Sequence, residues 1–287
     1  TFIIEHIQLK KVLITGINGQ DGSYLAELLL SKGYEVHGLV RREAMDDPLY
    51  RLSNINHIID DVSLHVGALD NHLSIYKIIA LVKPDECYHL ASSSFVSYNF
   101  EDESSLVANN FTATHALLAG IKELAPECRV YFAGSSEMFG DVKTSPQNEL
   151  TPFNPRSVYG ISKLAAFHLA RNYREHHELF IAAGILYNHE SPRRGYQFVT
   201  RKISATVAKI HLGLVERLEL GNIDALRDWG YAPDYVEAMH LMLQQDKPED
   251  FVIATGVQYS VRDFVNKSAN CLGLEIEWRG KAEKEEG

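Results

Sequence analysis

Long apolar runs, closely spaced cysteines and an excess of positive charge are missing from this 287-residue chain. No stretch approaches the roughly 18 apolar residues that a membrane span requires. The first residues, TFIIEHIQLKK, also lack the basic segment and long apolar core of a secretory signal. We therefore expect a cytoplasmic protein without a membrane partner.

Three cysteines are present, and Cys87, Cys128 and Cys271 do not have the CxxC or other spacing of a metal site. They are typical of small core residues in a reducing compartment, and we predict no metal. The net charge of −10 argues against a nucleic-acid partner. It leaves room for a local basic pocket that binds a phosphorylated small molecule.

The chain does contain a regular alternation of short β-rich runs and longer segments of helical period. The predicted strands are Val12–Thr15, Glu35–Val40, Ser63–Val66, Glu86–Leu90, Val130–Gly134 and Ile181–Leu186. The predicted helices are Ser23–Ser31, Leu73–Val82, Leu106–Leu124 and Tyr159–Arg174. Such alternation indicates βαβ units and a parallel sheet covered on both faces. The fold class is therefore α/β, a Rossmann-like doubly wound parallel sheet.

The pattern becomes looser after Asn188, where the loop SPRRG precedes a predicted helix at Val199–Leu212. Short apolar pieces follow at Leu218–Leu220 and Phe251–Thr255. We predict a larger domain over residues 1–187 and a smaller C-terminal lobe, mainly for substrate binding, over residues 188–287.

A glycine-rich turn, GINGQDG at residues 16–22, follows the first predicted strand and opens the first predicted helix. Glycines allow a tight turn and a close approach of the backbone to a pyrophosphate, and the helix N-terminus attracts an anion. The spacing is GxxGxxG, so a purely structural strand-to-helix turn remains the alternative.

Two arginines, Arg41 and Arg42, end the second predicted strand, where an NAD-specific enzyme often has an acid for the ribose 2′-hydroxyl. Cations at this point favour a 2′-phosphate and therefore NADP. The alternative is a pair of solvated arginines.

Four residues suggest catalysis on an alcohol. Tyr159 and Lys163 form a YxxxK pair on one helix face, in which the ammonium favours the phenolate. Ser135 and Glu137 follow the predicted strand Val130–Gly134, at the sheet edge where ligands bind. A hydroxyl, a phenol and an ammonium suffice for hydride transfer, and the carboxylate suits proton abstraction beside a new ketone. A surface Tyr–Lys pair and a helix-start glutamate are the alternatives.

With these residues the chain resembles the extended short-chain dehydrogenase/reductases and, within them, the GDP-mannose 4,6-dehydratases. The resemblance covers nearly the whole chain and includes LITGINGQDGSYLAE, GSSEMFG, TPFNPRSVYGISK, NHESPRRG, FVTRKI and GNIDALRDWG. NHESPRRG, FVTRK and RDWG are its most specific segments.

The resemblance implies a redox-neutral cycle on NADP that converts GDP-mannose into GDP-4-keto-6-deoxymannose, as in 6-deoxyhexose biosynthesis. Tyr159, assisted by Lys163 and Ser135, would take the 4-hydroxyl proton while hydride leaves C4. Glu137 would then remove the C5 proton, water would leave C6, and the hydride would return to C6. The enzyme would be a hydro-lyase that keeps its cofactor bound.

The resemblance also assigns binding residues. The implied cofactor contacts, besides Tyr159 and Lys163, are Gly16, Ile17, Asn18, Gly19, Gln20, Asp21, Arg42, Ala68, Leu69, Leu90, Ala91, Ser92, Ser93, Ser94, His189 and Arg194. The implied contacts of the GDP-sugar are Ser94, Ser136, Glu137, Asn188, Val199, Lys202, Gly221 and Arg227. Lys202 and Arg227 supply the cationic donors that a diphosphate prefers.

Several positions depart from the family. Ala68 stands where the family has an aspartate near the adenine, and Ser105 stands where it often has a tyrosine. Glu43–Asp47 follow the arginines in place of a serine-rich loop that helps to build the family's tetramer. We expect a homodimer or homotetramer, and whether this loop contributes to the interface remains an open question at this point. Family members continue past the position of Gly287, so we do not expect every guanine-binding residue in this chain.

Alternative functions remain open at this point. The same dehydration of a GDP-manno-heptose would use the same motifs, because that substrate differs beyond C6. A GDP-4-keto-6-deoxy-sugar reductase or epimerase would keep Ser135, Tyr159 and Lys163 but would not need Glu137. A non-catalytic NADP-binding protein would tolerate the loss of Tyr159, Lys163 or Glu137, and all three are present.

Overall fold

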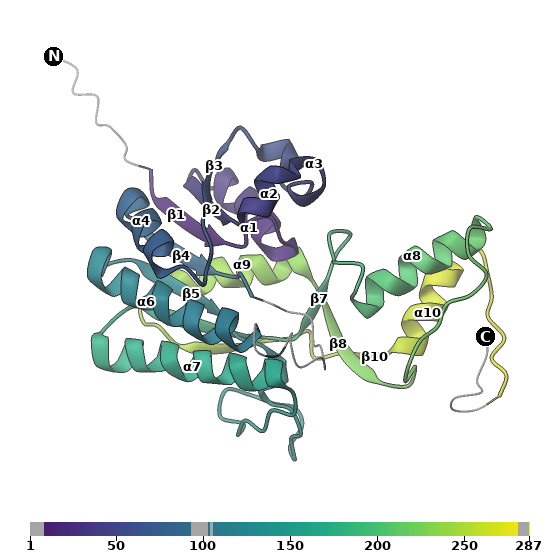
Figure 1. The fold of residues 1–287 in the computed structure, drawn as a ribbon. Coiled ribbons are helices and arrows are strands. Elements are labelled where there is room, and N and C mark those ends of the chain that lie inside the picture. The colour runs from purple at the N-terminus through teal and green to yellow at the C-terminus, as the bar shows by residue number, and fades with distance from the viewer. Residues whose placement is uncertain (1–8, 93–102, 104–105, 281–286) are drawn as a thin grey trace. The chain divides into compact units, whose positions relative to one another are not determined.

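The computed structural model describes residues 9–92, 103, 106–280 and 287. The chain forms two compact units (Figure 1). The first unit consists of the residues up to Tyr187 together with Ala232–Ile253. The second unit consists of Asn188–Tyr231 together with the residues from Ala254 onward.

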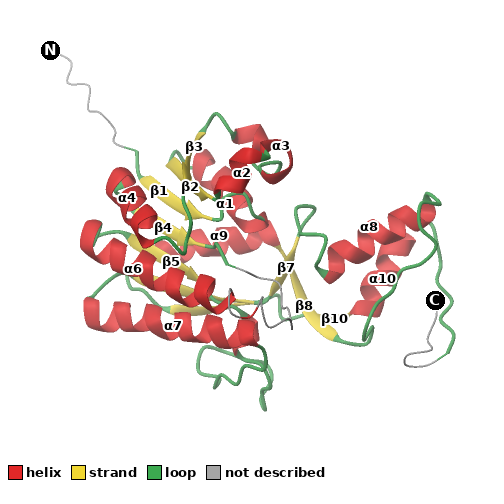
Figure 2. Ribbon diagram, in the orientation of Figure 1, coloured by secondary structure: helices red, strands yellow, loops and turns green. Residues whose placement is uncertain are grey.

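The first unit is built on a seven-stranded parallel sheet of order β3-β2-β1-β4-β5-β6-β9 (Figure 2). Its strands are β1 (Lys11–Thr15), β2 (Glu35–Val40), β3 (Val62–Val66), β4 (Glu86–His89), β5 (Arg129–Ala133), β6 (Ile181–Leu186) and β9 (Asp250–Ile253). The chain runs outward from β1 through β2 to β3, and β4 then pairs with the other side of β1. The predicted Rossmann-like, doubly wound sheet is confirmed.

The central strands are apolar because the sheet is covered on both faces. In β1, Leu13 enters one hydrophobic core, whereas Val12 and Ile14 enter the other. In β5, Phe132 and Tyr131 divide between the same two cores in the same way. Successive side chains of a strand point to opposite faces, so each strand contributes to both cores.

Two layers of helices cover these cores. Helices α4 (His72–Val82), α6 (Ala113–Leu124) and α7 (Val158–His177) pack on the core that contains Leu13, while α1 (Gln20–Ser31) and α9 (Ala232–Leu243) pack on the other. The short helical segments described in this unit are α2 (Arg42–Asp46), α3 (Pro48–Arg51), η1 (Asn56–Ile58), η2 (Ala108–Thr112) and η3 (Ser136–Met138). No helix of the described residues is long and apolar enough to cross a membrane.

The second unit combines a small sheet with two helices. Strand β8 (Leu226–Tyr231) pairs with β7 (Asn188–Glu190) in parallel and with β10 (Gln258–Ser260) in antiparallel orientation. Helices α8 (Val199–His211) and α10 (Val261–Asn270) form a separate core through Ile203, Val207, Val261 and Val265. A capping box between Ser260 and Asp263 begins α10.

The second unit does not run without interruption over residues 188–287. It begins at Asn188, but residues 232–253 return to the first unit. Met239 of α9 is fully buried in the core that contains Val12, and β9 pairs with β6. The predicted apolar piece Phe251–Thr255 therefore belongs largely to the seven-stranded sheet, because its strand completes the edge beside β6.

The predicted helix Leu106–Leu124 also differs in part. The structure has a π-helical segment, η2, before the regular helix α6. Within this region the Thr114 hydroxyl donates to the Asn110 carbonyl oxygen at 2.6 Å. Such side-chain bonds to the backbone compete with regular helix geometry, and π-helical turns are frequent at functional sites.

Candidate active site

The glycine-rich turn between β1 and α1 is built so that only glycine fits at key positions. Gly16 has a φ of +77°, in the left-handed region. A Cβ on Gly22 would lie 2.2 Å from the Gly16 carbonyl oxygen. Gly19 is the N-cap of α1 and supplies no capping side chain. A helix N-terminus that opens on such a turn is suited to a pyrophosphate.

The turn lies where the strand order of the sheet reverses. A Cβ on Gly16 would be 3.0 Å from the Cα of Ala91, which follows β4. The turn after β1 and the segment after β4 therefore meet at the carboxyl ends of their strands. Ligands of open α/β sheets bind at this switch point, so the predicted phosphate turn has the expected location.

The other predicted residues of this turn offer mainly backbone groups. The Ile17 side chain is fully buried in the core. The Asn18 amide donates to the Arg51 carbonyl oxygen at 3.0 Å. The Gln20 amide donates to the Asp21 carboxylate at 3.0 Å.

The predicted adenosine-side residues lie at the ends of β2 and β3. Arg42 is the first residue of α2, Arg41 is its N-cap, and both are exposed. The Ala68 backbone exchanges hydrogen bonds with the Ser74 hydroxyl at 3.1 and 3.3 Å. Leu69 is buried in the core. Arg42 can thus meet a 2′-phosphate, whereas positions 68 and 69 offer no polar side chain to an adenine.

The segment after β4 is described as far as Ser92. The backbone N–H groups of Leu90 and Ala91 both donate to the Thr15 hydroxyl at 3.1 Å. The Ser92 hydroxyl donates to the Asn110 side chain at 2.8 Å. The predicted contacts Ser93 and Ser94 lie outside the described residues, as does Ser105.

The candidate catalytic hydroxyl and carboxylate lie just beyond the carboxyl end of β5. Ser135 is the N-cap of η3, and its hydroxyl accepts the Glu137 N–H at 3.3 Å. Ser136 is the first residue of the same turn. Glu137 is exposed, so its carboxylate is open to a ligand in the free protein.

Tyr159 and Lys163 lie one turn apart near the N-terminus of α7, which Ser157 caps by accepting the Gly160 N–H at 3.1 Å. Tyr159 is 9% exposed and Lys163 is 6% exposed. The Lys163 ammonium donates to the Ala133 carbonyl oxygen at 2.9 Å. Burial lowers the pKa of Lys163 from 10.5 to about 8. The lysine can therefore change its charge near neutral pH.

Gly160 brings the two candidate catalytic segments together. A Cβ at this position would lie only 2.5 Å from the Glu137 carbonyl oxygen. Helix α7 therefore rests directly on η3, with the backbone of Glu137 in the place of a side chain. The structure thus brings together the segments that carry Ser135, Glu137, Tyr159 and Lys163.

The predicted residues of the NHESPRRG segment belong to the second unit. Asn188 and His189 lie on β7, and His189 is buried. The Arg194 guanidinium pairs with Glu190 at 3.2 Å and lies 3.6 Å from the centre of the Phe198 ring. Arg194 is thus already held within its own segment.

The remaining predicted substrate residues also lie in the second unit. Val199 is the first residue of α8. The Lys202 ammonium donates to the Glu219 carbonyl oxygen at 2.7 Å. Gly221, two residues after Glu219, is exposed. Arg227 is exposed on β8 and donates to the Leu226 carbonyl oxygen at 2.7 Å.

Comparison with known proteins decides the family. The family model described as GDP-mannose 4,6 dehydratase matches residues 13–287. The chain belongs to the GDP-mannose 4,6-dehydratase family. It is 52% identical to the GDP-mannose 4,6 dehydratase of Cricetulus griseus over 97% of this chain and 76% of that one. The GDP-mannose 4,6-dehydratase of Vibrio cholerae is 48% identical over 97% of this chain and 76% of its own length.

Solved structures support the fold of this GDP-mannose 4,6-dehydratase family member. A dTDP-glucose 4,6-dehydratase from Bacillus anthracis in complex with NAD superimposes with a TM-score of 0.80 at 21% identity, over 92% of this chain and 81% of that one. RMD from Pseudomonas aeruginosa complexed with NADPH gives a TM-score of 0.77 at 22% identity, over 94% and 83% of the two chains. At these identities the likeness concerns the fold alone.

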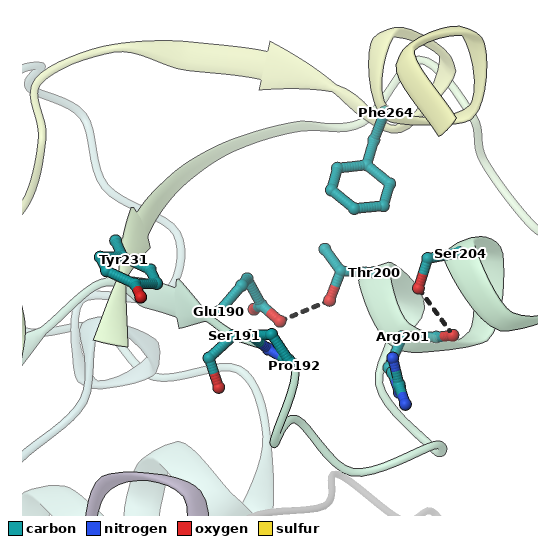
Figure 3. A pocket seen from close by; sticks show the side chains of 8 residues that line it. All are labelled: Glu190, Ser191, Pro192, Thr200, Arg201, Ser204, Tyr231 and Phe264. Carbon is teal, nitrogen blue, oxygen red and sulfur yellow. Dashed lines mark hydrogen bonds between the residues drawn. The ribbon is translucent and has the colours of Figure 1, made fainter. Parts of the chain in front are cut away.

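A cavity of about 350 Å³ lies within the second unit of this dehydratase-family chain (Figure 3). Glu190, Thr200 and Tyr231 line it, and the Thr200 hydroxyl donates to the Glu190 carboxylate. Sequence reasoning did not assign these residues to a site. Among the described residues, no group of three or more histidine, cysteine, aspartate or glutamate side chains is placed to hold a metal ion.

Sequence reasoning also missed a set of buried polar residues behind the candidate catalytic groups. His89, Asn110, Thr114 and Ser162 are all buried and hydrogen bonded to one another or to the segments above. Asn110 and His89 lie far apart in sequence from Ser162, so no local motif connects them. The available signal was a histidine near the end of a predicted strand.

Proposed function

We propose that this protein converts GDP-mannose into GDP-4-keto-6-deoxymannose with NADP as a recycled cofactor. The observation that carries the proposal is the direct packing of η3, with Ser135 and Glu137, on the start of α7, with Tyr159 and Lys163. The relatives at 52% and 48% identity, named GDP-mannose 4,6-dehydratases, support the choice of substrate.

The cofactor site fits a dinucleotide. A Cβ at Gly22 would meet the backbone of the turn itself, so the turn depends on glycine, as a turn that lets its backbone approach a pyrophosphate does. Arg42, exposed at the start of α2, is our candidate for the 2′-phosphate. Held by these residues, NADP would supply the hydride acceptor for C4 of the sugar and the hydride donor for C6.

Tyr159 is the proposed base for the 4-hydroxyl of the sugar. Lys163 lies one helical turn away, and its ammonium, which donates to the Ala133 carbonyl oxygen, supplies the positive charge for this step. Ser135 donates a hydrogen bond to the same sugar oxygen and thereby orients it. These three groups remove the hydroxyl proton as the C4–H bond breaks, and the product of this step is a 4-ketone.

Glu137 is the proposed acid and base for the loss of water. The 4-ketone acidifies the proton on C5, and the exposed carboxylate takes this proton. The same carboxyl group then delivers a proton to the leaving 6-hydroxyl, so that water departs and a C5–C6 double bond remains. Returning the hydride to C6 and adding at C5 one proton, which balances the proton that Tyr159 removed from the 4-hydroxyl, would complete a cycle with no net oxidation.

The second unit supplies our proposed contacts for the GDP portion. Lys202 and Arg227 are cationic partners for the diphosphate, and Asn188, Val199 and Gly221 are further contacts. We also propose His189 and Arg194 as cofactor contacts, because the resemblance to the family assigns them this role. The paired charges at Arg194 and Glu190 mean that Arg194 keeps one internal partner when a phosphate binds.

Isotope transfer tests the reaction directly. GDP-mannose carrying deuterium at C4 is incubated with the protein and catalytic NADP, without added reductant, and the product is analysed by mass spectrometry and NMR. The proposal expects loss of one water, deuterium at C6, and no accumulation of NADPH. A product that requires stoichiometric NADPH would identify a reductase instead, and a parallel incubation with a GDP-manno-heptose tests the substrate.

The Glu137→Gln variant tests the role of the carboxylate. It should bind NADP as the wild type does and should oxidise C4 reversibly but release no water, which the absorbance of the reduced nicotinamide on the enzyme can detect. Glu175→Gln, at an exposed position near the other end of α7, is the matched control and should keep full activity. Normal turnover by Glu137→Gln would remove Glu137 from the mechanism.

A further inference from the structure

His89 is a buried histidine with a partner at each ring nitrogen. It is the last residue of β4 and only 4% exposed. Its Nδ1 lies 2.9 Å from the Thr15 hydroxyl, at the end of β1, and its Nε2 lies 3.1 Å from the Thr114 hydroxyl on α6. The ring therefore connects the strand before the phosphate turn to the helix that follows η2.

The surrounding hydrogen bonds define which nitrogen carries the proton. The Thr114 hydroxyl donates its one proton to the Asn110 carbonyl oxygen, so it must accept from the Nε2–H of His89. The Nδ1 of a neutral ring then has a lone pair, which accepts the proton of the Thr15 hydroxyl. The Thr15 oxygen in turn accepts the N–H groups of Leu90 and Ala91.

His89 stays uncharged over the working pH range. Burial, and secondarily the charge of Lys163, lower the pKa of His89 from 6.5 to about 3. A protonated ring could not accept from Thr15. The neutral form thus satisfies both partners and adds no charge beside Lys163.

The Thr114 side of the ring reaches the catalytic helix. Thr114 bonds to the Asn110 carbonyl, and the Asn110 amide donates to the Ser162 hydroxyl at 3.0 Å. Ser162 donates to the Tyr159 carbonyl oxygen at 2.8 Å. We call Thr15, His89, Thr114, Asn110 and Ser162 the His89 network. It extends from the turn that faces the proposed cofactor to the backbone of the proposed base.

From this geometry we infer that His89 is a positioning residue whose two nitrogens serve two different steps. The Nδ1 acceptor holds Thr15 and the backbone of residues 90–91 beside the proposed cofactor. The Nε2–H donor holds Asn110 and, through Ser162, the first turn of α7 with Tyr159. The second role rests on the proposed function, whereas the first requires only that the protein binds NADP.

Two substitutions separate these roles. In His89→Asn the side-chain oxygen stands at the same bond distance from Cα as Nδ1, so the acceptor for Thr15 remains and the donor is lost. In His89→Gln the side-chain nitrogen stands at the same bond distance as Nε2, so the donor for Thr114 remains and the acceptor is lost. Calorimetric titration with NADP alone gives the affinity, and turnover of GDP-mannose at saturating NADP gives kcat.

We expect His89→Gln to weaken NADP binding about five- to tenfold, the usual effect of one lost hydrogen bond that leaves a buried group unpaired, with kcat nearly unchanged. We expect His89→Asn to lower kcat by a similar factor with NADP affinity nearly unchanged. The pH profile of kcat should keep its shape in both variants, because His89 does not titrate there. Hydrogen exchange in residues 108–114 should increase only in His89→Asn.

Several results would overturn the inference. Equal changes of NADP affinity and kcat in both variants, or no change in either, would leave His89 with a general packing role. Loss of a pH limb in a variant would make His89 a titrating group. Should either variant unfold, Thr15→Val and Thr114→Val test the same two bonds from their other ends. If the wild type binds NADP but does not dehydrate GDP-mannose, the calorimetric and exchange measurements still decide for or against the two roles.

Discussion

Replacing Gly160 by alanine should separate the two segments that carry the proposed catalytic residues. The added Cβ would lie 2.5 Å from the Glu137 carbonyl oxygen and 3.1 Å from the Cβ of Pro155. The nearer atom belongs to the backbone of η3, so no side-chain rotation can relieve the contact. Helix α7 and η3 must move apart, and Tyr159 and Lys163 must move away from Ser135 and Glu137.

The size of the effect follows from this overlap. Because real Cβ atoms essentially never come within 3.0 Å of another heavy atom, the two segments must separate by roughly half an ångström or more. A misplacement of about 1 Å can cost about a hundredfold in rate, so we expect a loss in kcat of about ten- to a hundredfold. Overpacking costs about 1 to 3 kcal/mol, and the better helix propensity of alanine offsets about 1 kcal/mol of it.

The assay compares Gly160→Ala with Gly120→Ala. Gly120 also lies inside a helix, α6, but a Cβ there would meet the Cδ1 atom of Ile79 at 2.8 Å, the far end of a flexible side chain. Both variants gain the same helix propensity. Thermal unfolding and NADP titration check that each variant is folded and binds the cofactor. Deuterium transfer from C4 to C6 then measures activity, which should fall in Gly160→Ala and remain near the wild-type value in Gly120→Ala.

Two outcomes would refute this reasoning. Activity of Gly160→Ala within twofold of the wild type, in a folded protein, would mean that the spacing of η3 and α7 does not govern the reaction. An equal loss in both glycine variants would assign the effect to general destabilisation instead.

Other variants test separate parts of the proposal. Gly22→Ala, whose Cβ would lie 2.2 Å from the Gly16 carbonyl oxygen, should abolish NADP binding as measured by calorimetry. Arg42→Ser should weaken NADP binding about ten- to a hundredfold, the value of a charge-assisted hydrogen bond, and leave NAD affinity unchanged. Because burial lowers the pKa of Lys163 to about 8, kcat should fall as pH rises through about 8, and a pH profile of kcat would check this. Burial disfavours the charge of Lys163 in the folded state, so Lys163→Met should have a higher free energy of unfolding than the wild type below pH 8. Between pH 8 and 10.5 lysine is neutral in the folded state but still charged in the unfolded state, which stabilises the wild type. The difference between the two proteins in denaturant titrations should therefore shrink over this range.

The sheet could be predicted from sequence because its signals are local. Runs such as Val12–Ile14 and Ile181–Leu186 are continuously apolar, as strands buried on both faces usually are, and the segments between the strands have helical period. The candidate catalytic residues could also be selected from sequence, because Tyr159 and Lys163 share a helix face and Ser135 follows the predicted strand Val130–Gly134. Their chemical roles stay predictions.

The supporting residues could not be predicted in the same way, because their partners are distant in sequence. Nothing near Gly160 indicates that the Glu137 backbone occupies the place of its side chain. In the sequence His89 is one polar residue near the end of a predicted strand. Only the fold shows that Thr15 and Thr114 lie at its two ring nitrogens. The geometry of a site is set by such long-range contacts, and a motif records only the groups that touch the ligand.

The order of elements explains why the sequence predicts one continuous range for the second unit. After β6 the chain forms β7, α8 and β8 in the second unit, and it returns to the first unit as α9 and β9. Tyr235, Val236, Met239 and Leu243 are buried in the core beneath α1, at the spacing of one helix face. A fragment that ended at Tyr187 would lack this face and the edge strand beside β6, and would expose the core that contains Val12 and Ile14. Residues 188–231 are therefore inserted into the chain of the first unit, between β6 and α9.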